Sequence, residues 1–340
     1  MKKTKNPPDS VVLPLAESPI KTYLGFVANI GITLNNEKTW EWFHNHFVQI
    51  SYRDGGELLF KTYYPNLKKG KNFYAQDVKN AVDFVRNLLF DNKYIIAEID
   101  DFYIPCRLFY NREHLRHASL IYGYDDDKRV FYISGYDENW IYIKSTITYE
   151  ELSKAFYSTH ENSYFNIRSY KKSHQFKFNK KLMKDFFVDY LESNDSYYRT
   201  FHSYNPVINF AKLGLKLERK FLKSKVICGM AVYEPFIEYI SALGSEGVFL
   251  KTFHTFYEHK KLMRMRIEFM QENGYIQNAE NVYEQSKIIE QKSLIVRNIL
   301  IKCRIKNSFD EVTISKIIKL VEEIRDMEID LMRELVRLLS

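Results

Sequence analysis

Four short runs rich in β-branched and aromatic residues between residues 93 and 145 most constrain what this chain can fold into. They read KYIIAEID at 93–100, HASLIYGY at 117–124, RVFYISGY at 129–136 and NWIYIKS at 139–145. Short runs of this composition, bounded by polar turn residues, predict β-strands. The short polar turn DDDK, between the second and third runs, predicts a hairpin. The segment therefore predicts a meander of antiparallel strands.

Helical patterns flank this meander. The stretch DVKNAVDFVRNLLF at 77–90 repeats apolar residues at helical spacing, and Asp77 is a plausible N-cap. After the last strand, Thr148 and Glu151 stand at the spacing of a capping box at the start of TYEELSKAFY. Helix, strands and helix in this order predict an α+β domain.

The second half of the chain has a different period. From about residue 175 onward, apolar residues recur three and four positions apart with charged residues between them, and one long segment ends at Gly274, a typical residue after a helix. This pattern predicts an all-α helical domain. We expect the boundary within RSYKKSHQFK, which gives an N-terminal domain over 1–172 and a helical domain over 173–340.

Composition limits the partners. The 340 residues carry a net charge of +7, but the basic runs are short and acidic residues are interleaved. Nucleic-acid binders concentrate such an excess on one face, so we expect none here; an acidic carrier protein is the alternative. No stretch has the length of apolar residues that a membrane span or signal peptide needs, and three scattered cysteines predict no disulfide framework. We expect a cytoplasmic protein with no membrane partner.

Three segments carry a resemblance to a known family. They are EIDDFYIP, RHASLIYGYDDDKRVFYISGY and TYEELSKAF, between residues 98 and 156. Their layout resembles the papain-like fold of the C39-type peptidases, and more narrowly the N-terminal domain of the butirosin biosynthesis protein H family of bacterial antibiotic clusters. FHTFYEHKKLMRMRIEFM at 253–270 is similar to a helix in the C-terminal region of that family. The resemblance implies a central helix packed against an antiparallel sheet, and acyl transfer from a carrier protein to an amine.

The resemblance also implies a set of catalytic residues. A cysteine opens the central helix, a histidine starts the first hairpin strand, and an Asp or Asn on the next strand orients the histidine. An adjacent imidazole turns the thiol into a thiolate, and an acceptor on its other nitrogen fixes the tautomer. His117 matches the histidine. The orienting position falls near Gly135, which has no side chain, so Asp137 is the candidate if a bulge re-aims it.

The nucleophile has no match. The N-terminal region contains no cysteine, and the first one, Cys106, stands on the wrong side of the sequence order. Ser18, Thr22 and Thr33 are hydroxyls in the expected region. The expected substrate-binding residues of the implied cleft are Thr22, Tyr23, Trp40, Tyr103 and Tyr136.

Three functions stay open. The first is a degenerate family member of secondary-metabolite biosynthesis that binds a carrier-tethered acyl group or peptide. The second is an active acyltransferase or hydrolase with a displaced nucleophile and His117 as base. The third is a non-catalytic helical interaction protein, such as a homodimer.

No cofactor and no metal are expected, because His44 and His46 lack a third ligand at a recognisable spacing. A basic stretch in the second half is interpreted either as a solvated helix face or as a docking stripe for an acidic carrier protein. Its residues are Lys260, Lys261, Arg264 and Arg266.

Overall fold

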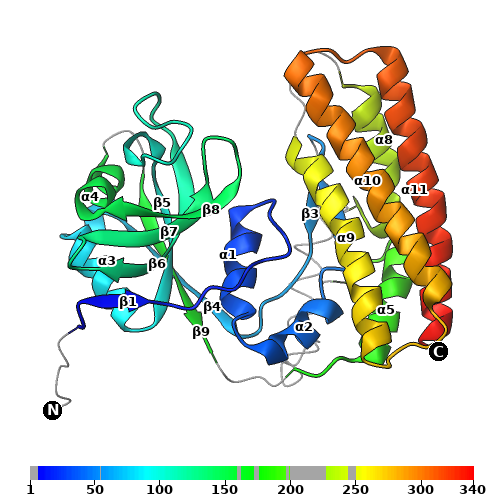
Figure 1. The fold of residues 1–340 in the computed structure, drawn as a ribbon, viewed down its shortest axis with the longest axis horizontal. Helices are drawn as coiled ribbons and strands as arrows, with labels where there is room; N and C mark the ends of the chain where they lie inside the picture. Colours follow the sequence, from blue (N-terminus) through cyan, green and yellow to red (C-terminus); the bar gives the residue numbers. More distant parts are fainter. Residues whose placement is uncertain are drawn as a thin grey trace, which may run out of the picture. The chain divides into compact units, whose positions relative to one another are not determined.

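The computed structural model describes residues 7–53, 55–158, 162–171, 176–196, 199, 227–243 and 250–340. The chain divides into two compact units. Unit 1 consists of residues 1–37 and 64–175, and unit 2 of residues 38–63 and 176–340. The chain is therefore a sheet-containing N-terminal part followed by a helical C-terminal part, as the change of period predicts (Figure 1).

Unit 1 is built on an antiparallel sheet. The strands follow the order β4-β9-β5-β6-β7-β8, and β1 pairs with the end of β6 (Figure 1). Their bounds are β1 Ser10–Val12, β4 Leu67–Tyr74, β5 Lys93–Asp100, β6 Arg116–Asp125, β7 Val130–Tyr136, β8 Tyr142–Thr148 and β9 Tyr164–Tyr170. The four predicted strands are the consecutive part of this sheet, β5 to β8, and the DDDK turn joins β6 to β7.

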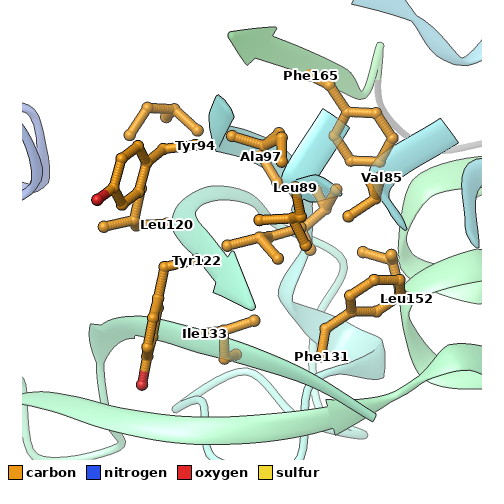
Figure 2. Close-up of a cluster of buried hydrophobic side chains, with 14 of the residues drawn as sticks. Val85, Leu89, Tyr94, Ala97, Leu120, Tyr122, Phe131, Ile133, Leu152 and Phe165 are labelled. Atoms are coloured by element: carbon orange, nitrogen blue, oxygen red, sulfur yellow. The ribbon is translucent and has the colours of Figure 1, made fainter. Parts of the chain in front are cut away.

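Helices cover both faces of this sheet. On one face, Val85 and Leu89 of α3 (Ala81–Phe90) and Leu152 of α4 (Tyr149–Tyr157) pack with Ala97 and Phe131 of the strands (Figure 2). The predicted capping box begins α4: the Thr148 hydroxyl accepts from the Glu151 amide, and the Glu151 carboxylate accepts from the Thr148 amide. This arrangement confirms the α+β prediction for the first half.

The helix α1 (Leu24–Thr33) contacts the other face. Asn29 accepts a hydrogen bond from Arg168, and Asn35, just past the helix, lies 3.5 Å from the hydroxyl of Tyr94. Arg168 and Tyr94 are directly opposite each other in the β5–β9 ladder, so their side chains share one face. The sheet of unit 1 therefore lies between α1 on one side and α3 with α4 on the other.

Unit 2 combines long helices with a small sheet. The helices are α2 Trp40–Asn45, α5 Lys180–Leu191, α8 Tyr233–Ser241, α9 Leu250–Glu272, α10 Glu280–Lys306 and α11 Glu311–Leu338. The three-stranded sheet has the order β10-β2-β3, with β2 Ile50–Arg53, β3 Glu57–Phe60 and β10 Ile227–Cys228. The strand β3 packs against α9, where the Thr252 hydroxyl donates to the Gly56 carbonyl at 2.6 Å.

The sequence predictions for the second domain and for the N-cap of α3 need correction. Unit 2 is not all-α, because residues 38–63, expected in the N-terminal domain, contribute α2 and two strands to it. Asp77 does not begin α3; Asn80 does, and accepts from the Asp83 amide. Asp77 instead closes a short 3-10 turn with Tyr74. The segment 209–224, whose spacing is also helical, lies outside the described residues.

Candidate functional site

His117 lies near the start of β6, and an acidic residue holds its ring. Its Nδ1 is 3.1 Å from Oδ2 of Asp101, whose side chain is only 2% exposed while that of His117 is 24% exposed. A carboxylate can only accept, so Nδ1 carries a proton, and in the neutral form of the ring the lone pair lies on Nε2. No hydrogen bond joins Nε2 to a described residue. Asp101 therefore fixes the orientation of the ring through Nδ1, while Nε2 makes no hydrogen bond within the described part of the chain.

Asp101 is placed by the end of the neighbouring strand. It opens the short 3-10 helix η3 (Asp101–Tyr103) directly after β5, and its amide donates to the Leu115 carbonyl at 2.9 Å. Because Ile99 and His117 are paired in the β5–β6 ladder, the chain after Ile99 runs beside the chain before His117. The orienting carboxylate thus comes from the residue that directly follows β5.

Asp137, the predicted orienting residue, has another role. Its Oδ1 accepts from the amides of Asn139 and Ile141, both at 2.8 Å, and its own amide donates to the Ile141 carbonyl. These bonds close the loop between β7 and β8. Asp101 therefore supplies the carboxylate expected from Asp137, and the prediction for Asp137 is corrected.

The position expected to orient the histidine is filled by an arginine from elsewhere. An ideal β-carbon at Gly135 would lie 2.7 Å from Cζ of Arg107, so the guanidinium occupies the space that a side chain at 135 would need. Arg107 donates to the Ser119 hydroxyl at 2.6 Å and to the Tyr136 carbonyl, and its Nε is 3.8 Å from Oδ1 of Asp101. Glycine at 135 is therefore what allows a buried cation beside the pair.

Two aromatic rings flank His117. The Tyr136 ring is stacked with it at a centroid distance of 6.4 Å, and the Trp140 ring approaches edge-on at 6.0 Å. Trp140 is half exposed, at 50%, and has φ of 60°, which is unusual for a bulky residue. The bonds of Asp137 hold this loop. The exposed indole thus lies against the ring that carries the basic nitrogen.

Tyr136 also connects this region to the start of α1. Its hydroxyl donates to the carbonyls of Lys21 and Thr22, at 2.7 and 3.0 Å. The register, however, places the His117 side chain on the same face as Ile99 and hence as Ala97, which packs with residues of α3 and α4 (Figure 2). The implied catalytic imidazole would face the N-terminal helix, so the arrangement differs from that expectation; of the two aromatic residues beside His117, Tyr136 is the one hydrogen-bonded to the segment before α1.

Burial and hydrogen bonds shift the pKa of two carboxyl groups near the His117–Asp101 pair. Burial raises the pKa of the Glu98 carboxyl on β5, and the charges of Arg116 and His117 only partly oppose this effect. A second histidine is also held: Nδ1 of His114 is 2.7 Å from Oδ2 of Asp100. Burial raises the pKa of Asp100, but hydrogen bonds from Ser158, His114 and the Phe102 amide outweigh it and hold that pKa below its usual range.

The candidate nucleophiles have other partners. The Cys106 thiol is 3.3 Å from the Ser145 hydroxyl. The Ser18 hydroxyl donates to the Ile20 carbonyl, and the Thr33 hydroxyl donates to the Asn29 carbonyl, each at 2.7 Å. None of these groups is hydrogen-bonded to the His117 ring in the described structure.

The other predicted binding residues are dispersed. Thr22 is buried, Tyr23 precedes α1 as its N-cap, and Tyr103 ends η3. Trp40 begins α2 and so belongs to unit 2. The structure therefore brings Tyr136 to His117, joins the Thr22 backbone to Tyr136, and assigns Trp40 to a different compact unit.

The predicted docking stripe is not a surface. Lys260 and Arg266 are fully buried in unit 2, where Arg266 donates to the carbonyls of His44 and His46. Burial lowers the pKa of these histidines, to about 3 for His44 and about 4 for His46. The described residues contain no group of three or more His, Cys, Asp or Glu side chains arranged to hold a metal ion.

Sequence reasoning missed Asp100, Asp101 and Arg107. The signal was present in the pair of adjacent aspartates of EIDDFYIP, which follows a strand and precedes two histidines at 114 and 117. Adjacent residues point to different sides, which suits them to hold two rings. Nothing in the local pattern distinguishes Arg107 from a surface arginine.

Comparison with known proteins adds no family. No protein-family model matches the chain, and no curated protein matches it. Among the described helices, none combines the length and the apolar character that crossing a membrane requires.

Proposed function

We propose that unit 1 is an acyl-transfer domain in which His117, oriented by Asp101, acts as a general base without a thiol nucleophile. The observation that carries the proposal is the 3.1 Å contact between His117 Nδ1 and the buried Asp101 carboxylate. An imidazole held in this way has a fixed tautomer and gains stability when it accepts a proton. General base catalysis of this kind contributes roughly 10²- to 10⁴-fold in rate.

The substrate class follows from the resemblance to the C39-like and butirosin protein H families, and the papain-like relationship is part of the proposal. An acyl group bound as a carrier thioester would be attacked by an amine. Nε2 of His117 takes the proton from the attacking nitrogen as the new C–N bond forms. The C–S bond then breaks, and the proton passes to the leaving thiolate, so that an amide and a free thiol result. No covalent enzyme intermediate is needed.

The test is thiol release from an acyl thioester of N-acetylcysteamine, measured with and without a primary amine. We expect amine-dependent release that falls by roughly 10²- to 10⁴-fold in His117→Gln. Asp101→Asn should also slow the reaction strongly, because an amide can hold the wrong tautomer. His114→Gln is the matched control, since it alters a neighbouring histidine–aspartate pair and should retain the native rate. Equal rates in the native protein and His117→Gln would refute the proposal.

Intact mass after incubation with the thioester separates this mechanism from a displaced nucleophile. We expect no acyl adduct. A stable adduct on Cys106 or on a hydroxyl of residues 18–33 would instead establish covalent catalysis with His117 as the activating base.

A second candidate is binding without catalysis. It is favoured by the absence of a thiol or hydroxyl hydrogen-bonded to the His117 ring among the described residues, beside an indole that is 50% exposed. In that case an acylated carrier protein binds, the binding weakens in Trp140→Ala, and no thiol is released at any amine concentration.

A further inference from the structure

Arg107 is a buried cation beside the His117–Asp101 pair with no role in the reaction just described. Its side chain is 1% exposed, and that of Asp101 is 2% exposed. The guanidinium Nε and the carboxylate Oδ1 face each other at 3.8 Å, and neither atom has a hydrogen-bond partner in the described structure. Oδ1 of Asp101 therefore faces the permanent positive charge of Arg107, and Oδ2 faces the titratable ring of His117.

The chain places Arg107 by two consecutive turns. The Ile104 amide donates to the Asp101 carbonyl, and the Arg107 amide donates to the Ile104 carbonyl, each at 3.0 Å. These bonds fold the segment back over its own start. The bonds to Ser119 and to the Tyr136 carbonyl then fix the guanidinium over the sheet, in the space left by Gly135.

We propose that Arg107 is a positioning residue that sets the charge state of the His117–Asp101 pair and keeps the imidazole neutral, and hence basic, near neutral pH. This inference rests on the proposed general-base role of His117 for its functional meaning. An imidazolium beside a lone buried carboxylate is strongly stabilised, whereas a guanidinium that already compensates this carboxylate weakens that stabilisation. Arg107 thereby holds the pair in the form that can accept a proton.

Other charges act on the same ring. Glu98 on β5 interacts electrostatically with His117, and Arg116 is its neighbour on β6. Both are nearer to solvent than Arg107, so their influence is more screened. Asp101 and Arg107 are buried, as is Asp100, whose carboxylate accepts hydrogen bonds from His114 and Ser158.

The experiment follows protonation of His117 in the full chain by the pH dependence of its ring proton NMR signals, assigned by their loss in His117→Gln. In Arg107→Met we expect the midpoint to move to higher pH by about one unit, the lower end of the effect of a close opposite charge. Arg107→Lys keeps the charge and should give a midpoint between those of the native protein and Arg107→Met. Arg112→Met, an exposed arginine in the same loop, is the control and should leave the midpoint unchanged.

A second route to the same result keeps the arginine in the chain. In Gly135→Ala the new methyl group displaces the guanidinium, so the midpoint should rise as it does in Arg107→Met, and this variant serves if Arg107→Met fails to fold. An unchanged midpoint in folded Arg107→Met, or in Gly135→Ala, would overturn the inference. The measurement needs no turnover, so thiol release that does not depend on His117 would refute the proposed function and leave this result standing.

Discussion

A single buried carboxylate joins four helices of unit 2, and removing its cation should destabilise that unit strongly. The two oxygens of Glu328 on α11 accept from Nζ of Lys260 on α9 at 2.9 and 2.7 Å. Tyr190 of α5 and Tyr233 of α8 donate to it at 3.0 and 2.7 Å. All four side chains are fully buried or nearly so. The perturbation we choose is Lys260→Met, which removes the cation and keeps the volume.

The size of the expected destabilisation follows from the groups that still contact Glu328 in the variant. In Lys260→Met the carboxylate of Glu328 keeps two hydroxyl donors but loses the one cationic hydrogen-bond donor that the described residues give it. Breaking a buried ion pair from one side costs about 3–5 kcal/mol, because the other charge is left in a medium of low polarity. We therefore expect the free energy of unfolding to fall by about 3–5 kcal/mol at neutral pH.

The double variant Lys260→Met with Glu328→Gln should recover most of this loss. A glutamine accepts from both tyrosine hydroxyls, and its amide lies beside Nδ1 of His259, which is 3.8 Å from the Glu328 carboxylate. No charge is then left buried without compensation. Recovery on adding a second substitution distinguishes a charge effect from a simple packing defect.

The pKa of Glu328 determines how the destabilisation of Lys260→Met changes with pH. In the native protein, burial raises the pKa of Glu328, but the charges of Lys260 and His259 and the hydrogen bonds outweigh it, so this pKa is below its usual range. The resulting stability is present at neutral pH and is lost as pH falls through the folded pKa. Without Lys260, burial dominates and the folded pKa rises above that of the unfolded chain. The destabilisation of Lys260→Met is then largest at high pH and shrinks as pH falls toward about 4.

Urea denaturation followed by tryptophan fluorescence measures this effect, because Trp42 is buried in unit 2. Lys261→Met removes the neighbouring, half-buried lysine and should change the stability by less than about 0.5 kcal/mol. A loss below about 1 kcal/mol in Lys260→Met, or a double variant as unstable as the single one, would refute the reasoning.

Three further outcomes follow from the local geometry. Gly56→Ala should lower the free energy of unfolding by more than about 1 kcal/mol, because φ is 86° and the new methyl group meets the Tyr239 ring. Gly25→Ala, which has open space around it in α1, should raise the free energy of unfolding by about 0.5–1 kcal/mol, and thermal unfolding compares the two variants. Burial and Asp195 raise the pKa of Cys228 to about 11, so iodoacetamide should leave this thiol unmodified at pH 8 in the folded protein, and modification as fast as in urea would contradict its burial. Asp100→Asn should lower the free energy of unfolding by about 1–2 kcal/mol at pH 7. It should also make that free energy fall less steeply below pH about 4, because the lowered pKa of Asp100 stabilises the native protein above that pH and the effect is lost as pH falls. The same loss of stability in acid as in the native protein would contradict this.

The strands β5 to β8 could be predicted because each overlaps a short run that is rich in β-branched and aromatic residues and bounded by polar turn residues. The strand β9 was missed because polar residues interrupt its short run YFNIRSY and both strands that it pairs with lie far away in sequence. The strands β2 and β3 bury their residues against helices of the C-terminal half. Their assignment to unit 2 depends on contacts that a local pattern does not contain.

The buried charges of α9 escaped prediction for a related reason. Lys260 and Arg266 stand among other basic residues, and their spacing is compatible with a solvated face. Their partners are 68 residues away for Lys260 and more than 200 for Arg266. Charged residues enter a core only when paired, and a pair formed over such separations leaves no trace in either segment alone.

In the candidate site, His117 could be found from its place at the head of a strand, and its partner could not. The expectation that the orienting residue follows the histidine led to Asp137, which closes a turn instead. Asp101 comes beside His117 only through the pairing of β5 with β6. The glycine at 135, interpreted as a missing acceptor, is the position that admits Arg107.

The assignment of residues 38–63 to unit 2 has a consequence for the order in which the protein acquires its structure during synthesis. The chain leaves unit 1 after residue 37, returns at 64 and leaves it again after 175. On the ribosome, the early segment with α2, β2 and β3 must wait for most of the remaining chain before its helical neighbours emerge. A fragment that stops after unit 1 would carry this apolar hairpin without its cover. Such a fragment, residues 1–175, should need chaperones or aggregate. If residues 38–63 of the same fragment are replaced by a short linker, we expect unit 1 to fold as a soluble domain.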